Sequence, residues 1–160
     1  MKNFGKILAC MAALTPLQGL ADTVFVATVL RIVDGDTIKV STPIGVDTVR
    51  LYGIDTPEKR QPYGTVSTQE LKNLTKGKKI VIVSRGRGSF GRLLGEIHLI
   101  GSSVNQSIVE NGHAHVYKTN QDKNLLKAQQ KAIDNQLGLW KNKLVVYPWE
   151  FRKLKRNKGH

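Results

Sequence analysis

Alternating apolar and polar positions mark the first part of the chain as a set of strands. Residues 23–33 are rich in β-branched side chains and alternate loosely, as a strand with one buried face does. The pattern returns over residues 37–41 and 46–54, and turns containing Gly35 and Gly45 separate the segments. The pattern therefore predicts an antiparallel meander of three strands.

Two more strands follow in the pattern. The apolar run from Ile80 to Val83 predicts a strand over residues 79–85, and residues 92–100 predict another after a glycine-rich loop. The residues between the meander and the fourth strand have helical periodicity, with Leu71 and Leu74 three positions apart.

We expect about three helices. The first carries the capping-box pattern Ser67-Thr68-Gln69-Glu70, although it can begin a turn earlier, and Gly77 ends it. The others are expected over residues 105–111 and 123–137, each followed by a glycine. Five strands with a helix between the third and fourth is the order of an OB-fold barrel, a frequent nucleic-acid-binding scaffold. The prediction is therefore an α+β fold, mainly β, built on a five-stranded OB-fold barrel.

The first 21 residues have the layout of a secretory signal peptide. Lys2 and Lys6 precede an apolar run over residues 7–14 that is too short to span a bilayer, and Gly19-Leu20-Ala21 offers a cleavage site. A buried N-terminal helix is one alternative, and lipoprotein-type cleavage before Cys10, the only cysteine, is another. The layout favours export to the periplasm or the medium, with no membrane attachment after removal of the signal.

The remaining 139 or so residues suit one domain and a core that needs no disulfide. We expect this domain to cover residues 22–150 and to be a monomer. A basic tail over residues 151–160 is expected to be disordered at its end. The tail carries five cationic residues: Arg152, Lys153, Lys155, Arg156 and Lys158.

The net charge and the placement of the acidic residues indicate what the protein binds. The chain has 25 Lys and Arg against 12 Asp and Glu, which favours a polyanionic partner such as nucleic acid. Four of the few acids nevertheless lie in two short motifs, Asp34-Gly35-Asp36 and Asp55-Thr56-Pro57-Glu58. The first motif alone would be an ordinary turn. Together they suggest a site of oxygen ligands for a hard cation, for which Ca²⁺ is suited.

Three further positions point to phosphodiester chemistry. Strand alternation puts Arg50, Tyr52 and Ile54 on one face, and an arginine directed into a small barrel needs an anion. Glu58 could polarise a metal-bound water. Arg92, after the flexible Gly91, could supply a second guanidinium to the phosphate.

At these residues the sequence resembles the staphylococcal (micrococcal) nuclease family, in the form of exported bacterial nucleases. The matching segments are Val33-Asp34-Gly35-Asp36-Thr37, Arg50 through Glu58, Phe90-Gly91-Arg92 and Gly138-Leu139-Trp140. The resemblance implies an OB-fold enzyme that uses one Ca²⁺ to hydrolyse DNA and RNA to 3′-phosphate products. It implies Asp36, Asp55 and the Thr56 carbonyl as metal ligands, Arg50 and Arg92 as phosphate clamps, and Glu58 as the general base or the group that positions the attacking water.

The sequence departs from the family at two places. The loop that usually reads Asp-x-Tyr-Gly-Arg is Gly88-Ser89-Phe90-Gly91-Arg92 here. The family's later pair of tyrosines is matched only loosely, by Tyr117, with His113 and His115 nearby. These two histidines could ligate a transition metal, but a core or solvated role is the simpler interpretation.

The expected protein is thus an exported, Ca²⁺-dependent, sugar-nonspecific endonuclease. The alternative is a non-catalytic OB-fold module that binds nucleic acid by charge and stacking. The presence of every metal and catalytic position favours the enzyme.

Overall fold

The computed structural model describes residues 23–142 and 144–158, and its first three strands form the predicted meander. Strands β1 (Val24–Asp34), β2 (Thr37–Thr42) and β3 (Gly45–Leu51) pair antiparallel in chain order. The turn between β1 and β2 brings Asp34 opposite Thr37, and Thr37 lies opposite Arg50 of β3. The first acidic motif therefore lies beside the end of β3.

Two later strands close the sheet into a barrel. Strand β5 (Lys79–Arg87) pairs antiparallel with β1, and β6 (Leu93–Leu99) pairs antiparallel with β5 and parallel with β3. The closed order β1-β2-β3-β6-β5 confirms the predicted five-stranded OB-fold barrel. Gly95 permits the closure, because a Cβ atom there would lie 2.9 Å from Ile82 Cγ2 and 3.0 Å from Val49 Cγ1.

Three two-residue strands complete the sheets. Strand β7 (Ser102–Ser103) pairs with β6 at the edge of the barrel sheet. Strands β4 (Ile54–Asp55) and β8 (His115–Val116) form a separate antiparallel pair, with Asp55 opposite His115. This short pair links the second acidic motif to the part of the chain after α2.

Apolar side chains of alternate strand positions fill the barrel. The buried strand residues include Ala27, Val29, Ile38, Val40, Val49, Leu51, Ile80, Ile82 and Ile97. Their burial is the main stabilisation available to a chain whose described part contains no cysteine.

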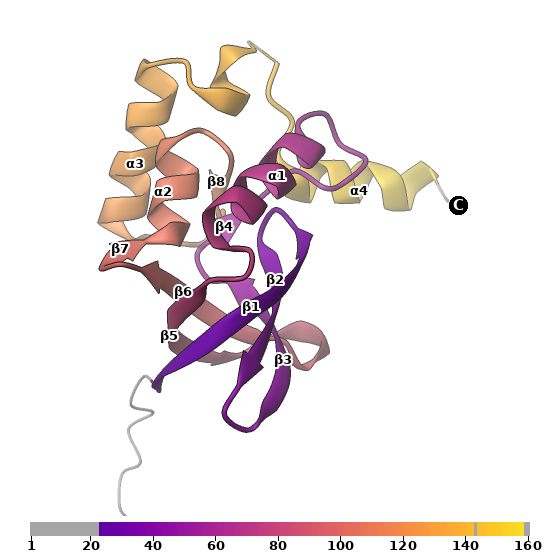
Figure 1. Ribbon diagram of the computed structural model, residues 1–160. Helices are drawn as coiled ribbons and strands as arrows, with labels where there is room; N and C mark the ends of the chain where they lie inside the picture. Colours follow the sequence, from indigo (N-terminus) through magenta and orange to yellow (C-terminus); the bar gives the residue numbers. More distant parts are fainter. Residues whose placement is uncertain (1–22, 143, 159–160) are drawn as a thin grey trace, which may run out of the picture.

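The described residues form four α-helices, one more than the three expected, and these helices lie above the barrel in the view of Figure 1. Helix α1 (Gly64–Thr75) packs across β1, while α2 (Val104–Glu110) and α3 (Lys123–Asp134) pack against each other. Helix α1 begins at Gly64, one turn before the capping-box motif, which is the earlier start that the sequence allowed. Ser67 therefore does not cap it, and its hydroxyl donates to the His113 carbonyl at 2.7 Å.

The fourth helix, α4 (Pro148–Lys158), occupies residues that were expected to be a basic tail. The predicted domain boundary at residue 150 falls inside this helix, and the last two residues of the tail, at whose end disorder was predicted, lie outside the described residues. Tyr147 and Trp149 stack with ring centroids 4.6 Å apart, and His115 lies 4.8 Å from the Tyr147 ring. Gln61 Nε2 also donates to the Val146 carbonyl at 2.6 Å. These contacts hold the start of α4 against the body of the protein.

The predicted signal peptide lies outside the described residues. Within the described residues, no helix has the length and apolar character needed to cross a membrane. Two short 3₁₀ helices, at Ser89–Gly91 and Gly138–Lys141, complete the secondary structure.

Candidate active site

Asp36 is held in place by the turn that precedes it and by the loop after β4. Its backbone N–H donates to Asp34 Oδ1 at 3.2 Å, which fixes the turn. Its carboxylate accepts from the backbone N–H and the hydroxyl of Thr56 at 3.0 and 3.1 Å, and from the Thr37 hydroxyl at 3.0 Å. Gly35 allows this approach, since a Cβ atom there would lie 2.7 Å from the Thr56 hydroxyl oxygen. The two acidic motifs therefore meet, as the sequence predicted.

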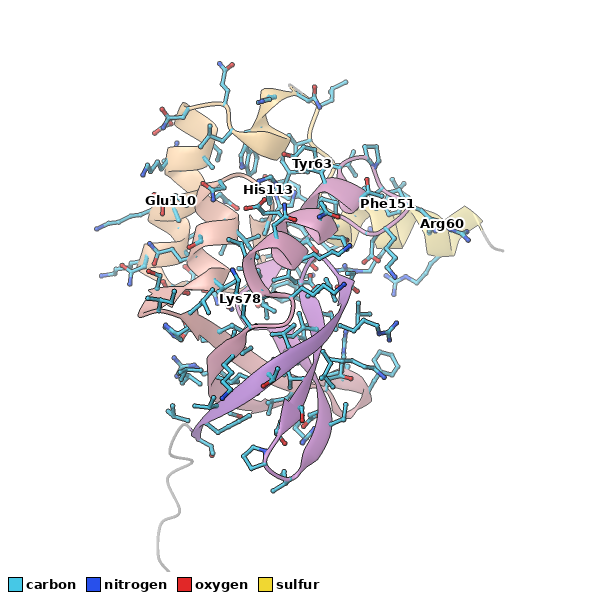
Figure 2. All side chains as sticks on the ribbon, viewed as in Figure 1. Arg60, Tyr63, Lys78, Glu110, His113 and Phe151 are labelled. Atoms are coloured by element: carbon cyan, nitrogen blue, oxygen red, sulfur yellow. The ribbon has the colours of Figure 1, made fainter. Side chains whose placement is uncertain are left out.

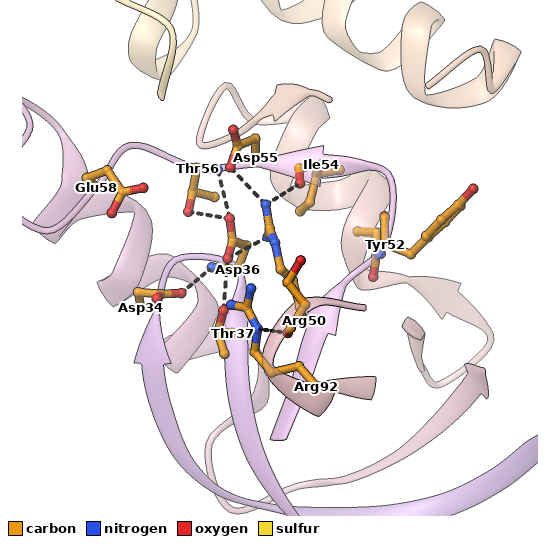
Figure 3. A network of polar contacts seen from close by, with 12 residues as sticks. Asp34, Asp36, Thr37, Arg50, Tyr52, Ile54, Asp55, Thr56, Glu58 and Arg92 are labelled. Atoms are coloured by element: carbon orange, nitrogen blue, oxygen red, sulfur yellow. Dashed lines mark hydrogen bonds and ion pairs between the residues drawn. The ribbon is translucent and has the colours of Figure 1, made fainter. Parts of the chain in front are cut away.

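Arg50 lies between the two aspartates (Figure 3). Its Nη1 forms an ion pair with Asp36 Oδ1 at 2.7 Å, without the alignment of a hydrogen bond. Its Nη2 donates to Asp55 Oδ1 at 2.8 Å and to the Ile54 carbonyl at 3.3 Å. Burial opposes the charge of the guanidinium, but attraction to Asp36 and Asp55 outweighs it and raises the pKa of Arg50. The predicted anionic partner exists, and here it is the protein's own carboxylates.

Tyr52, which strand alternation predicted on one face with Arg50 and Ile54, lines the same cleft as both of them. Strand β3 ends at Leu51, and Gly53 has a φ of +79°, which interrupts the alternation of the strand. The Tyr52 side chain is exposed and points away from the carboxylates, while Ile54 is buried (Figure 3).

A third arginine reaches the site from α4. Arg152 Nη2 donates to Asp55 Oδ2 at 2.7 Å, and its Nη1 donates to Asp55 Oδ1 at 3.3 Å and to Glu58 Oε1 at 2.7 Å. Hydrogen bonds to Asp55 and Glu58 raise the pKa of Arg152 against the opposing effect of burial. Sequence reasoning missed this residue, because five cations in one short segment resemble a solvated tail.

Negative charge accumulates on the first motif and on Asp55. Burial, followed by repulsion from Asp36, raises the pKa of Asp34 to about 6. Burial also raises the pKa of Asp55, although its hydrogen bond with Arg152 acts in the opposite direction. A bound cation would favour the ionised form of these carboxylates and so oppose the effect of burial on their pKa values.

Arg92 approaches from the barrel loop on the other side. Its Nε donates to the Ser89 carbonyl at 3.3 Å, and its guanidinium lies 5.7 Å from the centre of the Phe90 ring. Phe90 is 95% exposed and has a φ of +61°, in the left-handed region. Arg92 thus lacks the carboxylate contacts that fix Arg50, consistent with the altered family motif in this loop.

One cleft of about 590 Å³ contains all of these groups. Its lining includes the six residues predicted from the sequence, Asp36, Arg50, Asp55, Thr56, Glu58 and Arg92, together with Arg152. The structure therefore brings together every predicted site residue.

The possible donors for a metal in this cleft are carboxylate and carbonyl oxygens, which suit a hard cation such as Ca²⁺. Within the described residues there is no cluster of three or more His, Cys, Asp or Glu side chains able to hold a metal. Asp36, Asp55 and the Thr56 carbonyl fit a site of mixed side-chain, backbone and water ligands. Asp55 already contacts two guanidinium groups, so Arg152 and a metal would compete for its oxygens.

The two nearby histidines lie outside the cleft lining. His115 is fully buried, and neither ring nitrogen has a hydrogen-bond partner in the part of the chain that the structure describes. It packs among the rings of Trp140, Tyr147 and Trp149, and burial lowers its pKa to about 4. His113 stacks on Tyr63 with ring centroids 5.7 Å apart (Figure 2). Both contacts favour the packing role over the metal-ligand role.

A small closed barrel with carboxylates and guanidinium groups in one cleft defines a class of proteins that can bind a phosphodiester beside a divalent cation. Comparison with known sequences identifies the member of that class. Residues 48–142 match the model of the family described as staphylococcal nuclease homologue. The chain belongs to the staphylococcal nuclease family.

Individual relatives cover most of the chain. It is 40% identical over 126 residues to an "Uncharacterized endonuclease" of Escherichia coli, covering 78% of this chain and 82% of that protein. It is 32% identical over 142 residues to the Escherichia coli "Protein ParB", covering 81% and 80% of the two chains. The "Staphylococcal-like nuclease CAN1" of Arabidopsis thaliana is 33% identical over 109 residues, which span 68% of this chain and 34% of that protein.

Proposed function

We propose that this chain is a Ca²⁺-dependent endonuclease that hydrolyses DNA and RNA to products with a 3′-phosphate. Family membership and relatives named as endonuclease or nuclease support an enzyme that hydrolyses nucleic acid. The observation that carries the finer proposal is the position of Arg50, which joins Asp36 to Asp55 in a cleft that Glu58 and Arg92 also line.

Asp36, Asp55 and the Thr56 carbonyl would hold the Ca²⁺, and the chemistry supplied there is polarisation of a phosphoryl oxygen. Arg50 and Arg92 present guanidinium groups to the phosphate from two sides and stabilise the charge that develops in the transition state. Arg50 is already fixed by carboxylates, so its orientation needs no large rearrangement.

Glu58 accepts the proton of the attacking water. The water oxygen bonds to phosphorus, and the bond from phosphorus to the 5′-oxygen breaks. The 5′-oxygen leaves with the electron pair and takes a proton from solvent, and the phosphate remains on the 3′-oxygen. The Glu58 side chain is 43% exposed, so water can reach it, while Arg152 holds one of its oxygens at 2.7 Å. Arg152 thus positions the proposed base.

Degradation of single-stranded DNA by the purified protein tests the proposal. Cleavage should require Ca²⁺, stop with a Ca²⁺ chelator, and leave 3′-phosphate ends. Protein that binds the same DNA in Ca²⁺ without cleaving it would instead be the OB-fold binding module.

We also propose that the protein is exported and acts as a monomer from a mature chain that begins at Asp22. The order of Lys2, the apolar run over residues 7–14 and Gly19-Leu20-Ala21 supports this proposal. N-terminal sequencing of active protein from the periplasm or medium tests it, and an intact Met1 would contradict it.

A further inference from the structure

A second groove, of about 490 Å³, lies between β1 and α1. Four cationic side chains line it: Arg31, Lys59, Lys72 and Lys76. No carboxylate lines the groove, and none of the four cations forms an ion pair with a carboxylate among the described residues. Their charge is therefore available to a ligand, and we call this surface the cationic groove.

Helix α1 presents one polar face to the cationic groove. Thr65, Thr68, Gln69, Lys72 and Lys76 recur at intervals of three and four residues, which places them along one side of a helix. From Thr65 to Lys76 the helix rise is on the order of 16 Å. Glu70, the acid of this helix, does not line the groove but lines a neighbouring hollow that shares Thr65 and Gln69 with it. The cations therefore lie toward both ends of the groove, with Lys72 and Lys76 at the end of α1 and Lys59 before its start.

The cationic groove begins where the active-site cleft ends. Val33 and Lys59 line the groove, while their chain neighbours Asp34 and Glu58 line the cleft. The two hollows therefore share a rim made of residues 33–34 and 58–59. In Figures 1 and 2, α1 lies beside β1, the two elements that carry most of the groove residues.

We propose that the cationic groove binds the sugar-phosphate backbone of the polynucleotide strand that leaves the cleft past Glu58. This inference rests on the proposed function. A path of about 16 Å would span about five nucleotides at the 3.4 Å spacing of a duplex strand, and fewer in an extended single strand. No aromatic side chain lines the groove, so it holds phosphates and does not stack bases. Such contacts are independent of base sequence.

The test replaces three groove cations and spares the site. The variant Arg31→Gln/Lys72→Gln/Lys76→Gln leaves Lys59 intact, because Lys59 adjoins Glu58. The matched control, Lys123→Gln/Lys127→Gln/Lys141→Gln, removes the same charge from exposed positions on α3 and the following 3₁₀ helix. Three quantities are measured: the salt dependence of binding to a 30-nucleotide single strand, kcat/KM on that strand and on a dinucleotide, and binding to vesicles of anionic phospholipid.

The groove variant should flatten the slope of log affinity against log salt by about 2, at roughly 0.7 per lost contact on a single strand. Its kcat/KM on the long strand should fall at least tenfold, while kcat/KM on the dinucleotide stays at the wild-type value. The control should keep a steeper slope than the groove variant and near-normal activity on both substrates.

Equal slopes for the groove variant and the control would overturn the proposal, as would an equal loss of kcat/KM on the long and short substrates. Loss of binding to vesicles of anionic phospholipid with an unchanged DNA slope would overturn it in favour of a membrane surface. A wild type that cleaves neither substrate would contradict the proposed function, while the binding slopes would still decide the role of the groove.

Discussion

Arg152 and Asp55 form a two-point contact between residues 97 positions apart, with Nη2 to Oδ2 at 2.7 Å and Nη1 to Oδ1 at 3.3 Å. Asp55 is 1% exposed, so the contact neutralises a carboxylate that water barely reaches. The same guanidinium also contacts Glu58. One residue of the last helix therefore controls the charge of a proposed metal ligand and the position of a proposed base.

Replacement of Arg152 by Gln should lower the stability of the metal-free protein and raise its affinity for Ca²⁺. Without divalent cations, the free energy of unfolding should fall by about 1 to 3 kcal/mol, because Asp55 loses part of its hydrogen bonding. Ca²⁺ should bind several-fold more tightly, because a competing cation is gone, and it should reduce the difference in stability. Denaturant unfolding with chelator or Ca²⁺, together with calorimetric Ca²⁺ titration, measures both effects.

Lys153→Gln is the control for this change, since it removes a neighbouring exposed cation of α4. Equal Ca²⁺ affinity in the wild type and Arg152→Gln would show that Arg152 does not compete for Asp55.

Arg50 and Arg92 should respond differently to replacement by lysine. Arg50→Lys loses the planar group that reaches Asp36 and Asp55 at once, so both stability and turnover should fall, turnover on the order of 10²-fold or more. Arg92 has only the Ser89 carbonyl and the Phe90 ring as described contacts. Arg92→Lys should therefore reduce turnover and leave the melting temperature unchanged.

Melting curves and kcat/KM on single-stranded DNA measure the effects of Arg50→Lys and Arg92→Lys on stability and turnover. Near-normal turnover of Arg92→Lys would mean that the altered loop does not bring this arginine to the phosphate.

The sequence predicts the barrel and six site residues because their signals are local. Alternation marks each strand, and the acids of the two motifs flank strands that a small barrel must bring together. Arg152 could not be predicted in this way. Its placement depends on Tyr147 and Trp149 packing beside His115, contacts between segments far apart in the chain. Strand alternation likewise does not reveal that β3 ends at Leu51 or that Gly53 has a positive φ.

His115 should make the protein sensitive to mild acid. Its pKa falls from an ordinary value near 6.5 to about 4 in the folded state, because the ring is buried. Between these values the unfolded chain binds a proton that the folded chain does not, so stability is lost as pH falls from about 6.5 to 4. The loss is on the order of 3 kcal/mol. Stability above pH 6.5 is unaffected by this group.

The variant His115→Phe removes this titration and keeps an aromatic ring. Asp34, whose pKa is raised to about 6, acts in the opposite sense, so the measured quantity is the difference between wild type and variant. That difference in unfolding free energy should shift by about 3 kcal/mol in favour of the variant between pH 7 and pH 4. If the unfolding free energies of wild type and variant run parallel with pH, His115 binds its proton equally well in the folded and unfolded protein, and the prediction is wrong. His98→Gln, in β6, is the control.

Replacement of Glu58 tests whether the protein is an enzyme or a non-catalytic binding module. Its carboxylate is half exposed at the cleft and contacts Arg152, but it does not contact Asp36 or Asp55 in any described interaction. Glu58→Gln keeps a side-chain oxygen that can accept from Arg152 while removing the charge and the basicity. Folding, Ca²⁺ affinity and DNA binding should therefore change little. Turnover should fall by about 10² to 10⁴-fold, the contribution of a positioned general base.

The measurement is kcat on denatured DNA, with binding of the same DNA in Ca²⁺ as the parallel readout. Glu70→Gln on α1 is the matched control, because it removes a carboxylate outside the cleft. Wild-type kcat in Glu58→Gln would exclude this residue as the base. If the wild type and the variant bind DNA equally and neither cleaves it, the chain is the binding module, because the loss of a base can matter only in a protein that catalyses the reaction.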